Sequence, residues 1–337
     1  MKKTILYLSL LVLAACGNKK NIPDVSDVAV AVSIERFDKA FFKIDSNNIV
    51  PGLVQLNHQF PYFTNDFVAN ILGAGPLSDT NKTAFIATRQ FLTSYQPVKD
   101  YLQPKFENLS WLEKDLKKSF QFVKYYFPKY QLPPKVVSYI GPFDAPGVAM
   151  TRFTLAIGLQ LYGGKNFPFY QSQQGQELYP VYISRRFEPE YINANCMKAI
   201  SEDLFPDESG DKALIDQMIL KGKYWWLVNQ FIPESADSLI TGYTQKQTAW
   251  CNANEGMIWS FFLQNDVYNI EPDVIKIYIG DSPKTQGMPD ASPGNIGTWI
   301  GWQIVKKYAA EHPEVTPEKM MRLDPRKIFQ DAKYKPK

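Results

Sequence analysis

Histidine is almost missing from this chain of 337 residues, which contains only His58 and His312. Neither has a second histidine at helical spacing, and the chain contains no HExxH motif. Zinc hydrolases usually bring two or three histidines into one site. A site for a harder metal needs clustered oxygen ligands, and no Asp-rich loop of the EF-hand kind is present. We therefore expect neither a metal nor any other cofactor.

Motifs for nucleophilic catalysis are also missing, because the sequence lacks a G-x-S-x-G elbow. One S-x-x-K pattern joins Ser209 to Lys212 without its companion motifs, so Ser209 or Asp211 is better interpreted as a helix N-cap. Carboxylates such as Glu202 with Asp203 could in principle carry out acid–base chemistry. We predict a protein that is not an enzyme and assign no catalytic residue. An envelope hydrolase with a carboxylate site remains an alternative.

The chain also has little excess of either charge, because 37 Lys and Arg are balanced by 34 Asp and Glu, for a net charge of +3. Its basic residues form no long run. Without a basic patch we expect no nucleic-acid partner. Aromatic residues, in contrast, make up 14% of the chain. Most should fill the core, although such a content also suits surfaces that stack against sugars or peptides. A sugar- or peptide-binding uptake lipoprotein is therefore a further alternative.

The chain begins with MKKTILYLSLLVLAAC, in which an apolar run from Ile5 to Ala15 follows two lysines. This run is shorter than the roughly 20 residues that span a bilayer. A charged start, an apolar middle and small residues at the end are typical of a signal peptide, predicted here as residues 1–15. The letters LAAC resemble the lipobox of bacterial lipoproteins. That resemblance implies cleavage between Ala15 and Cys16 and acylation of Cys16, for example with palmitate.

Two or three acyl chains would hold the mature protein firmly in a membrane. Residues 16–27 then form a lipidated N-terminus and a polar spacer. The letters GNKK after the cysteine contain neither the aspartate that retains lipoproteins at the inner membrane nor an acidic signal for surface display. We expect an outer-membrane anchor that faces the periplasm.

Residues 28–337 are expected to form a single globular domain. The fold class should be α+β, predominantly helical with a small β-sheet, because helical patterns outnumber strand patterns. Alternating or β-branched runs predict strands at 28–32, 135–141, 152–164 and 274–280. Apolar residues at three- and four-residue spacing predict helices at about 83–126, 190–205, 211–231 and 254–266.

The segment ASPGNIGTWIGWQIVKKY, residues 291–308, is rich in glycine. It lacks the lysine of a phosphate loop and the spacing of a dinucleotide fingerprint, so we expect no nucleotide partner. Instead it predicts a helix that starts near Ser292 and Pro293. Its glycines would face a closely packed neighbour, and tryptophans would fill the space beside them. The expected helix-packing residues are Gly297, Gly301, Trp299 and Trp302.

Two cysteines remain in the mature part of the chain, Cys196 and Cys251. In an export compartment they could form a disulfide. Two cysteines do not make a disulfide framework, and packing in the core is the alternative.

Several motifs together resemble the gliding-motility lipoprotein family GldB. They follow the lipobox in the order SIERFD, FTLAIGLQLYGG, EYINANCMKAISEDLFP, NEGMIWSFFLQND and SPGNIGTWIGWQIVKKY. The resemblance implies an envelope lipoprotein required for gliding motility and the associated protein secretion, and it brings no catalytic residues. We expect a non-catalytic structural or scaffolding role among other gliding and secretion proteins of the envelope.

The order of these elements also faintly resembles a group of predicted zinc peptidases. In those proteins the helix that corresponds to INANCMKAIS would carry HExxH, and here it contains no histidine. The following helix, MILKGKYWWL, has no glutamate for a third ligand. This resemblance implies a degenerate zinc-peptidase-like scaffold that lacks the metal site.

Overall fold

A small mixed sheet lies at the centre of the computed structural model, which describes residues 22–77 and 82–336. Its strand order is β1-β2-β4-β3. Strands β1, β2 and β4 run parallel, and β3 pairs antiparallel with β4. Their bounds are β1 (Ile34–Arg36), β2 (Lys135–Tyr139), β3 (Val148–Met150) and β4 (Thr154–Gly158). The predicted class, α+β with mostly helices, is confirmed.

Both faces of the two central strands are buried, which explains their nearly continuous apolar sequence. Alternate residues of a strand point to opposite faces. Val136 and Leu155 belong to one hydrophobic cluster of the protein, whereas Val137 and Ala156 belong to another. The sheet therefore separates two cores and contributes side chains to each.

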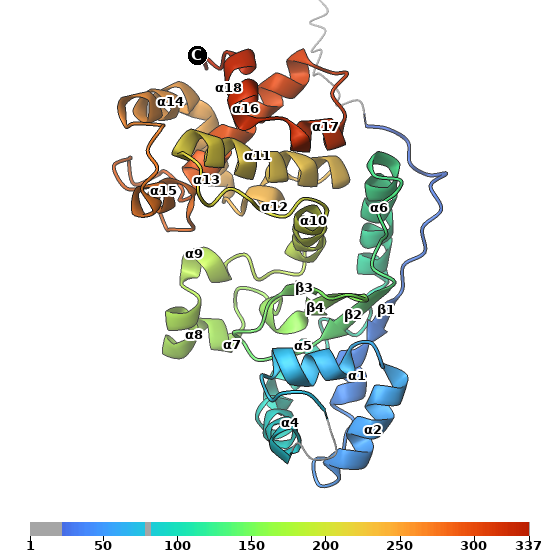
Figure 1. Cartoon of the computed structure of the whole chain (residues 1–337). Coiled ribbons are helices and arrows are strands. Elements are labelled where there is room, and N and C mark those ends of the chain that lie inside the picture. Colours follow the sequence, from blue (N-terminus) through green and yellow to red (C-terminus); the bar gives the residue numbers. More distant parts are fainter. Residues whose placement is uncertain (1–21, 78–81, 337) are drawn as a thin grey trace, which may run out of the picture.

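One core lies below the sheet in Figure 1 and is rich in phenylalanine. Phe37 and Phe67 have ring centroids 4.9 Å apart, and Phe41 and Phe67 have centroids 4.8 Å apart. Ring pairs at such distances add to the free energy of burial. The helices of this layer are α1 (Phe37–Phe41), α2 (Ile49–Gln59), α3 (Thr64–Asp66), the π-helix η1 (Phe67–Ile71), α4 (Lys82–Ser94) and α5 (Gln96–Leu102).

The other core is larger and lies above the sheet in Figure 1. Helix α11 is buried around most of its surface, and α16 packs against it. Helix α6 runs along one side. The elements are α6 (Ser110–Tyr126), η2 (Leu159–Leu161), α10 (Tyr191–Leu204), α11 (Leu214–Phe231), α12 (Asp237–Thr241), α13 (Gln245–Ala253), α14 (Glu255–Gln264), α15 (Pro272–Ile279), α16 (Ile296–Glu311), α17 (Pro317–Arg322) and α18 (Pro325–Ala332).

Three short helices lie to the side of the sheet: α7 (Pro168–Gln171), α8 (Gln173–Leu178) and α9 (Val181–Ser184). Tyr170 of α7 forms a third, small cluster with Phe143 and Phe167.

Two of the predicted strands are wrong. Residues 274–280 lie mostly in helix α15, where Pro272 occupies the first turn and Ile275 and Tyr278 face the core at a spacing of three. Residues 28–32 alternate as expected but form no strand. Their valines pack against the core beside α6, and the pairing with β2 begins only at Ile34.

The predicted starts of α11 and α16 are also wrong. Helix α11 has Ala213 as its N-cap, and the amide of Ser209 instead bonds to Asp207 Oδ1 at 3.1 Å. Helix α16 starts after Asn295, whose φ of 56° is left-handed. Ser292 lies upstream of α16, where its Oγ accepts a hydrogen bond from the Thr285 amide at 3.3 Å.

Candidate functional site

The predicted lipidation site, Ala15 and Cys16, lies outside the described residues. The first described residues, 22–33, run alongside α6 (Figure 1). Gln121 Nε2 donates a hydrogen bond of 2.9 Å to the Val28 carbonyl, and the Ile34 amide donates one of 2.8 Å to Glu113 Oε1. Gln121 Nε2 also lies 3.5 Å from the carbonyl of Ser26, at the end of the spacer, so side chains of α6 hold the last spacer residues and the first residues of the body.

The predicted glycine face of α16 lies in direct contact with the backbone of α11. A Cβ atom placed on Gly301 would lie 1.8 Å from the Met218 carbonyl oxygen. A Cβ on Gly222 of α11 would lie 2.3 Å from the Gly301 carbonyl carbon. A Cβ on Gly297 would meet the Tyr278 carbonyl oxygen at 3.0 Å. Sequence analysis missed Gly222, although it stands alone among large residues of a long apolar helix.

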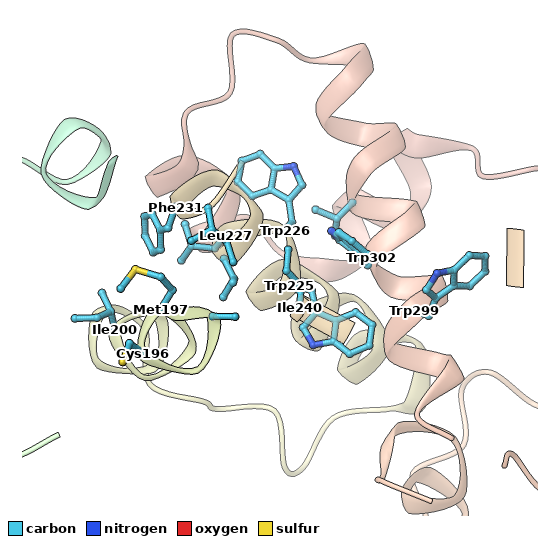
Figure 2. Packing of buried hydrophobic residues seen from close by; sticks show 14 of the residues in the cluster. Cys196, Met197, Ile200, Trp225, Trp226, Leu227, Phe231, Ile240, Trp299 and Trp302 are labelled. Atoms are coloured by element: carbon cyan, nitrogen blue, oxygen red, sulfur yellow. The ribbon is translucent and has the colours of Figure 1, made fainter. Parts of the chain in front are cut away.

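Tryptophans fill the space around this helix pair, and Figure 2 shows them on α11 and α16. Trp302 is buried and meets Trp225 edge to face, with ring centroids 5.8 Å apart and planes at 88°. Trp299 is also buried. The Lys306 ammonium lies 3.9 Å from the ring centroid of Trp302 and covers it from outside.

The cysteine pair does not form the disulfide that the sequence left open. Cys196 and Cys251 are both buried free thiols. Figure 2 shows Cys196 on α10, beside the residues that face α11. Burial raises the pKa of the Cys196 thiol and raises that of Cys251 to about 12. Both cysteines therefore act as small apolar residues of the core.

A buried lysine on α11 was also missed by sequence analysis. Lys223 is 0% exposed and donates hydrogen bonds to the carbonyls of Met321 and Leu323 at the C-terminal end of α17. Carbonyls at a helix end attract a cation. Burial nevertheless lowers the pKa of Lys223 to about 8. The residue joins α11 to the C-terminal helices.

A cavity with both charged and apolar lining residues opens at the carboxyl ends of the parallel strands β1, β2 and β4. We call it the carboxyl-edge pocket, and its volume is about 340 Å³. Asp38 is 5% exposed at its base; Arg36 binds it through two nitrogens, at 2.9 and 2.6 Å, and Ser138 Oγ donates to it at 2.6 Å. The complete lining is Arg36, Asp38, Lys39, Phe42, Lys43, Lys99, Leu102, Gln103, Phe106, Glu107, Ile140 and Leu159.

A second cavity, of about 440 Å³, lies between α6, α10 and the loop after α11, and we call it the side pocket. Trp111, which is 39% exposed, stands in its wall with Asp115, Glu190 and Asn193. Ser119 Oγ donates to Asn193 Oδ1 at 3.0 Å and fixes that amide. An aromatic ring next to carboxylates and an amide is the chemistry that recognises sugar hydroxyls.

Residues with metal-binding side chains are dispersed through the part of the chain that the structure describes. Residues 22–77 and 82–336 hold no group of three or more His, Cys, Asp or Glu placed to bind a metal ion. His58 lies near the end of α2, and His312 follows α16. Of the carboxylates considered from sequence, Asp203 accepts a hydrogen bond of 2.6 Å from the Tyr130 hydroxyl. Among the described helices, none combines the length and the apolar character needed to cross a bilayer.

Comparison with known proteins gives one match. Residues 18–336 match the family model described as gliding motility protein GldB, which covers nearly the whole chain. No curated protein and no solved structure matches the chain. The likeness to zinc peptidases consequently stays a prediction from sequence.

Proposed function

Because the chain belongs to the GldB family of gliding motility proteins, we propose that it is a non-catalytic scaffold of the gliding machinery and of the associated protein secretion, anchored by lipid in the outer membrane and facing the periplasm. One observation carries the proposal: the family match starts at residue 18, directly after the lipobox that ends at Cys16. A lipoprotein of this kind would act among other envelope proteins of the same machinery.

The geometry of the spacer supports a body held close to the membrane. Six Cα steps separate Cys16 from Ile22, the first described residue, and a fully extended chain covers at most about 20 Å in that number. Further along, residues Ser26, Val28 and Ile34 form hydrogen bonds with side chains of α6. The globular body, residues 28–337, would therefore remain within reach of proteins in the same membrane.

The surroundings of the most nucleophilic groups support a non-catalytic role. Both thiols are buried with raised pKa values, which disfavours the reactive thiolate. The Lys223 amine is occupied by the carbonyls at the end of α17. Asp38, the buried carboxylate of the carboxyl-edge pocket, is bound by Arg36 and Ser138. These groups serve packing and structure.

Replacing Cys16 tests the anchor. We expect Cys16→Ala to move the protein out of the membrane fraction and to abolish colony spreading and the linked secretion. The matched control is Ser26→Ala, an exposed change in the same spacer, which should leave fractionation and spreading unchanged. A Cys16→Ala protein that stays in the membrane, or that supports normal spreading, would contradict the proposal.

Labelling of cells tests the orientation. A membrane-impermeant amine reagent should leave the protein unmodified in intact cells and should label its exposed lysines once the outer membrane is permeabilised. Labelling of intact cells to the same extent would place the body on the outer surface instead.

The side pocket favours a second candidate function, the binding of sugars or peptides for uptake. Its wall combines the half-exposed Trp111 with Asp115 and Asn193. In that case Trp111→Ala would impair growth on one polysaccharide or peptide source while spreading stays normal. A gliding scaffold predicts the reverse for a deletion strain, with spreading lost on every carbon source.

A further inference from the structure

We infer that the carboxyl-edge pocket binds a phosphate monoester that carries an apolar body, a ligand function beyond the proposed scaffolding role. The pocket joins a cationic rim to an apolar wall, and its volume of about 340 Å³ falls in the range of small-molecule sites. Three features carry the inference: its place on the sheet, its charge and its apolar wall.

The pocket occupies the edge of the sheet where ligands of open parallel sheets usually bind. Arg36 ends β1, Ile140 follows β2 directly and Leu159 follows β4 directly. Parallel strands all end at the same edge, and loops leaving that edge in different directions create a crevice. Here α1 and α5 close the sides of the crevice, so residues far apart in sequence meet around one cavity.

The base of the pocket is rigid and its charges are fixed. The Asp38 carboxylate accepts hydrogen bonds from Ser138 Oγ and from Nε and Nη2 of Arg36, and the guanidinium balances its negative charge. Arg36 Nη1 also donates to the Glu107 carbonyl at 3.3 Å. Lys39 in turn binds the Glu107 carboxylate at 2.9 Å. Two ion pairs therefore account for both acidic side chains of the lining.

Two lysines of the lining bind neither of its acidic side chains. Among the described residues, the Lys43 ammonium has no hydrogen-bond or ion-pair partner, and the Lys99 ammonium binds Asp100, which does not line the pocket, at 3.0 Å. The lining holds four basic and two acidic side chains, an excess of two positive charges before Asp100, which pairs with Lys99 from outside the lining, is counted. A phosphate monoester carries nearly two negative charges at neutral pH. Lysine ammonium groups bind phosphate as point charges.

The apolar part of the lining selects for an apolar substituent on the phosphate. It consists of large hydrocarbon and aromatic side chains from α5, the loops and the strand ends: Phe42, Leu102, Phe106, Ile140 and Leu159. Burying each methylene of a ligand against such a wall should tighten binding about fourfold. A free inorganic phosphate would leave this surface unused.

The test uses the complete lipoprotein in phosphatidylcholine nanodiscs, with binding measured by titration calorimetry. The probes are inorganic phosphate, butyl phosphate, hexyl phosphate and hexanol. We expect hexyl phosphate to bind more tightly than butyl phosphate by about fifteenfold, and hexanol and inorganic phosphate to bind far more weakly. No binding of alkyl phosphates, or binding that does not depend on chain length, overturns the inference.

Rim variants test the role of the lysines. Lys43→Ala combined with Lys99→Ala should weaken hexyl phosphate binding by about tenfold or more, because two charge contacts are lost. Lys246→Ala, at an exposed position on α13, is the matched control and should bind as the unmodified protein does. Equal affinity in the double variant and the control overturns the inference, provided that all three proteins have the same melting temperature.

Competition identifies the source of the ligand. Displacement of hexyl phosphate when phosphatidic acid is added to the nanodisc lipids assigns the pocket to a lipid phosphate. Displacement by dissolved phosphate monoesters alone assigns it to a soluble metabolite. Either result supports the inference, whereas displacement by hexanol and not by either phosphate contradicts it.

Discussion

At Gly301 a single methyl group would be too large for the fold. Its Cβ would lie 1.8 Å from the Met218 carbonyl oxygen, and the obstacle is backbone that cannot rotate away. We predict that Gly301→Ala destabilises the protein by about 1–3 kcal/mol through overpacking, despite the higher helix propensity of alanine. Urea unfolding measures the free energy of unfolding.

Two other glycines provide controls for this experiment. Gly297→Ala should cost less, because its Cβ would meet the nearest atom at 3.0 Å. Gly210→Ala should be close to neutral, since nothing lies within 4 Å of its Cβ. Equal stabilities for all three variants would show that α11 and α16 are not in backbone contact.

Lys223 should make stability rise with pH in alkaline solution. Its pKa is about 8 in the folded protein and 10.5 in an ordinary environment, so between these values the unfolded chain binds more protons. The contribution of Lys223 to folding stability therefore increases with pH in this window, by about 1 kcal/mol per unit. Lys223→Met should lower the slope of stability against pH by that amount. Urea unfolding at pH 8, 8.5, 9 and 9.5 compares the variant with the unmodified protein and with Lys246→Met; equal slopes in all three would refute the prediction.

The state of the cysteines can be read from their reactivity. Cys196 and Cys251 are buried free thiols with raised pKa values, so we expect neither to react with a thiol reagent in the folded protein. Both should react in urea without any reductant. Thiols that become reactive only after a reductant is added would reveal a disulfide in the cell.

Among the elements, long helices with regular apolar spacing could be predicted, and α15 could not. In VIKIYIG the β-branched residues suggest a strand, and the same letters also place Ile275 and Tyr278 at helical spacing. Short apolar runs do not distinguish the two, and here the packing of α15 on α16 decides. The alternating pattern at 28–32 led to a wrong strand prediction for a related reason. A strand needs a neighbouring strand for its hydrogen bonds, and here the neighbour is helix α6.

The attachment of the spacer to α6 leads to a prediction at the scale of elements. Gln121 Nε2 satisfies the Val28 carbonyl, a group that no strand partner satisfies. Gln121→Ala should therefore loosen the spacer and raise its rate of limited proteolysis by about fivefold, the effect of losing one hydrogen bond of about 1 kcal/mol. The thermal midpoint of the body should barely change. Lys117→Ala, an exposed change on the same helix, is the control, and an equal rate for both variants would contradict the attachment.

At the scale of the whole molecule, the sequence predicted the fold class and the family but not the pockets. The carboxyl-edge pocket combines Asp38, Lys99, Ile140 and Leu159, which become neighbours only through the strand order. No motif marks such a set, because each residue on its own is ordinary for a helix or a strand end. Only one glycine of the contact between α11 and α16 could be predicted. Gly301 belongs to a repeated glycine pattern in the sequence, whereas the role of Gly222 follows only from its contact with Gly301 in the structure.

Because the sheet contributes side chains to both cores, we predict that the two layers of the molecule unfold together. All seven tryptophans belong to α6 or to the helices above the sheet, so tryptophan fluorescence reports on that layer. Phe67 is fully buried in the other layer, and Phe67→Ala should cost about 3–5 kcal/mol there. If residues 28–337 fold as one domain, the free energy of unfolding measured by tryptophan fluorescence must fall by the same amount.

The coupling would run through β2, whose Val136 packs above the sheet and whose Val137 packs below it. Losing the lower layer would uncover one face of this strand and weaken the upper layer with it. We therefore expect fluorescence and far-UV circular dichroism to give one midpoint in urea, shifted equally by Phe67→Ala. Phe153→Ala, at an exposed site, should shift neither. A fluorescence midpoint that stays in place while the dichroism signal falls at lower urea would show two layers that unfold independently.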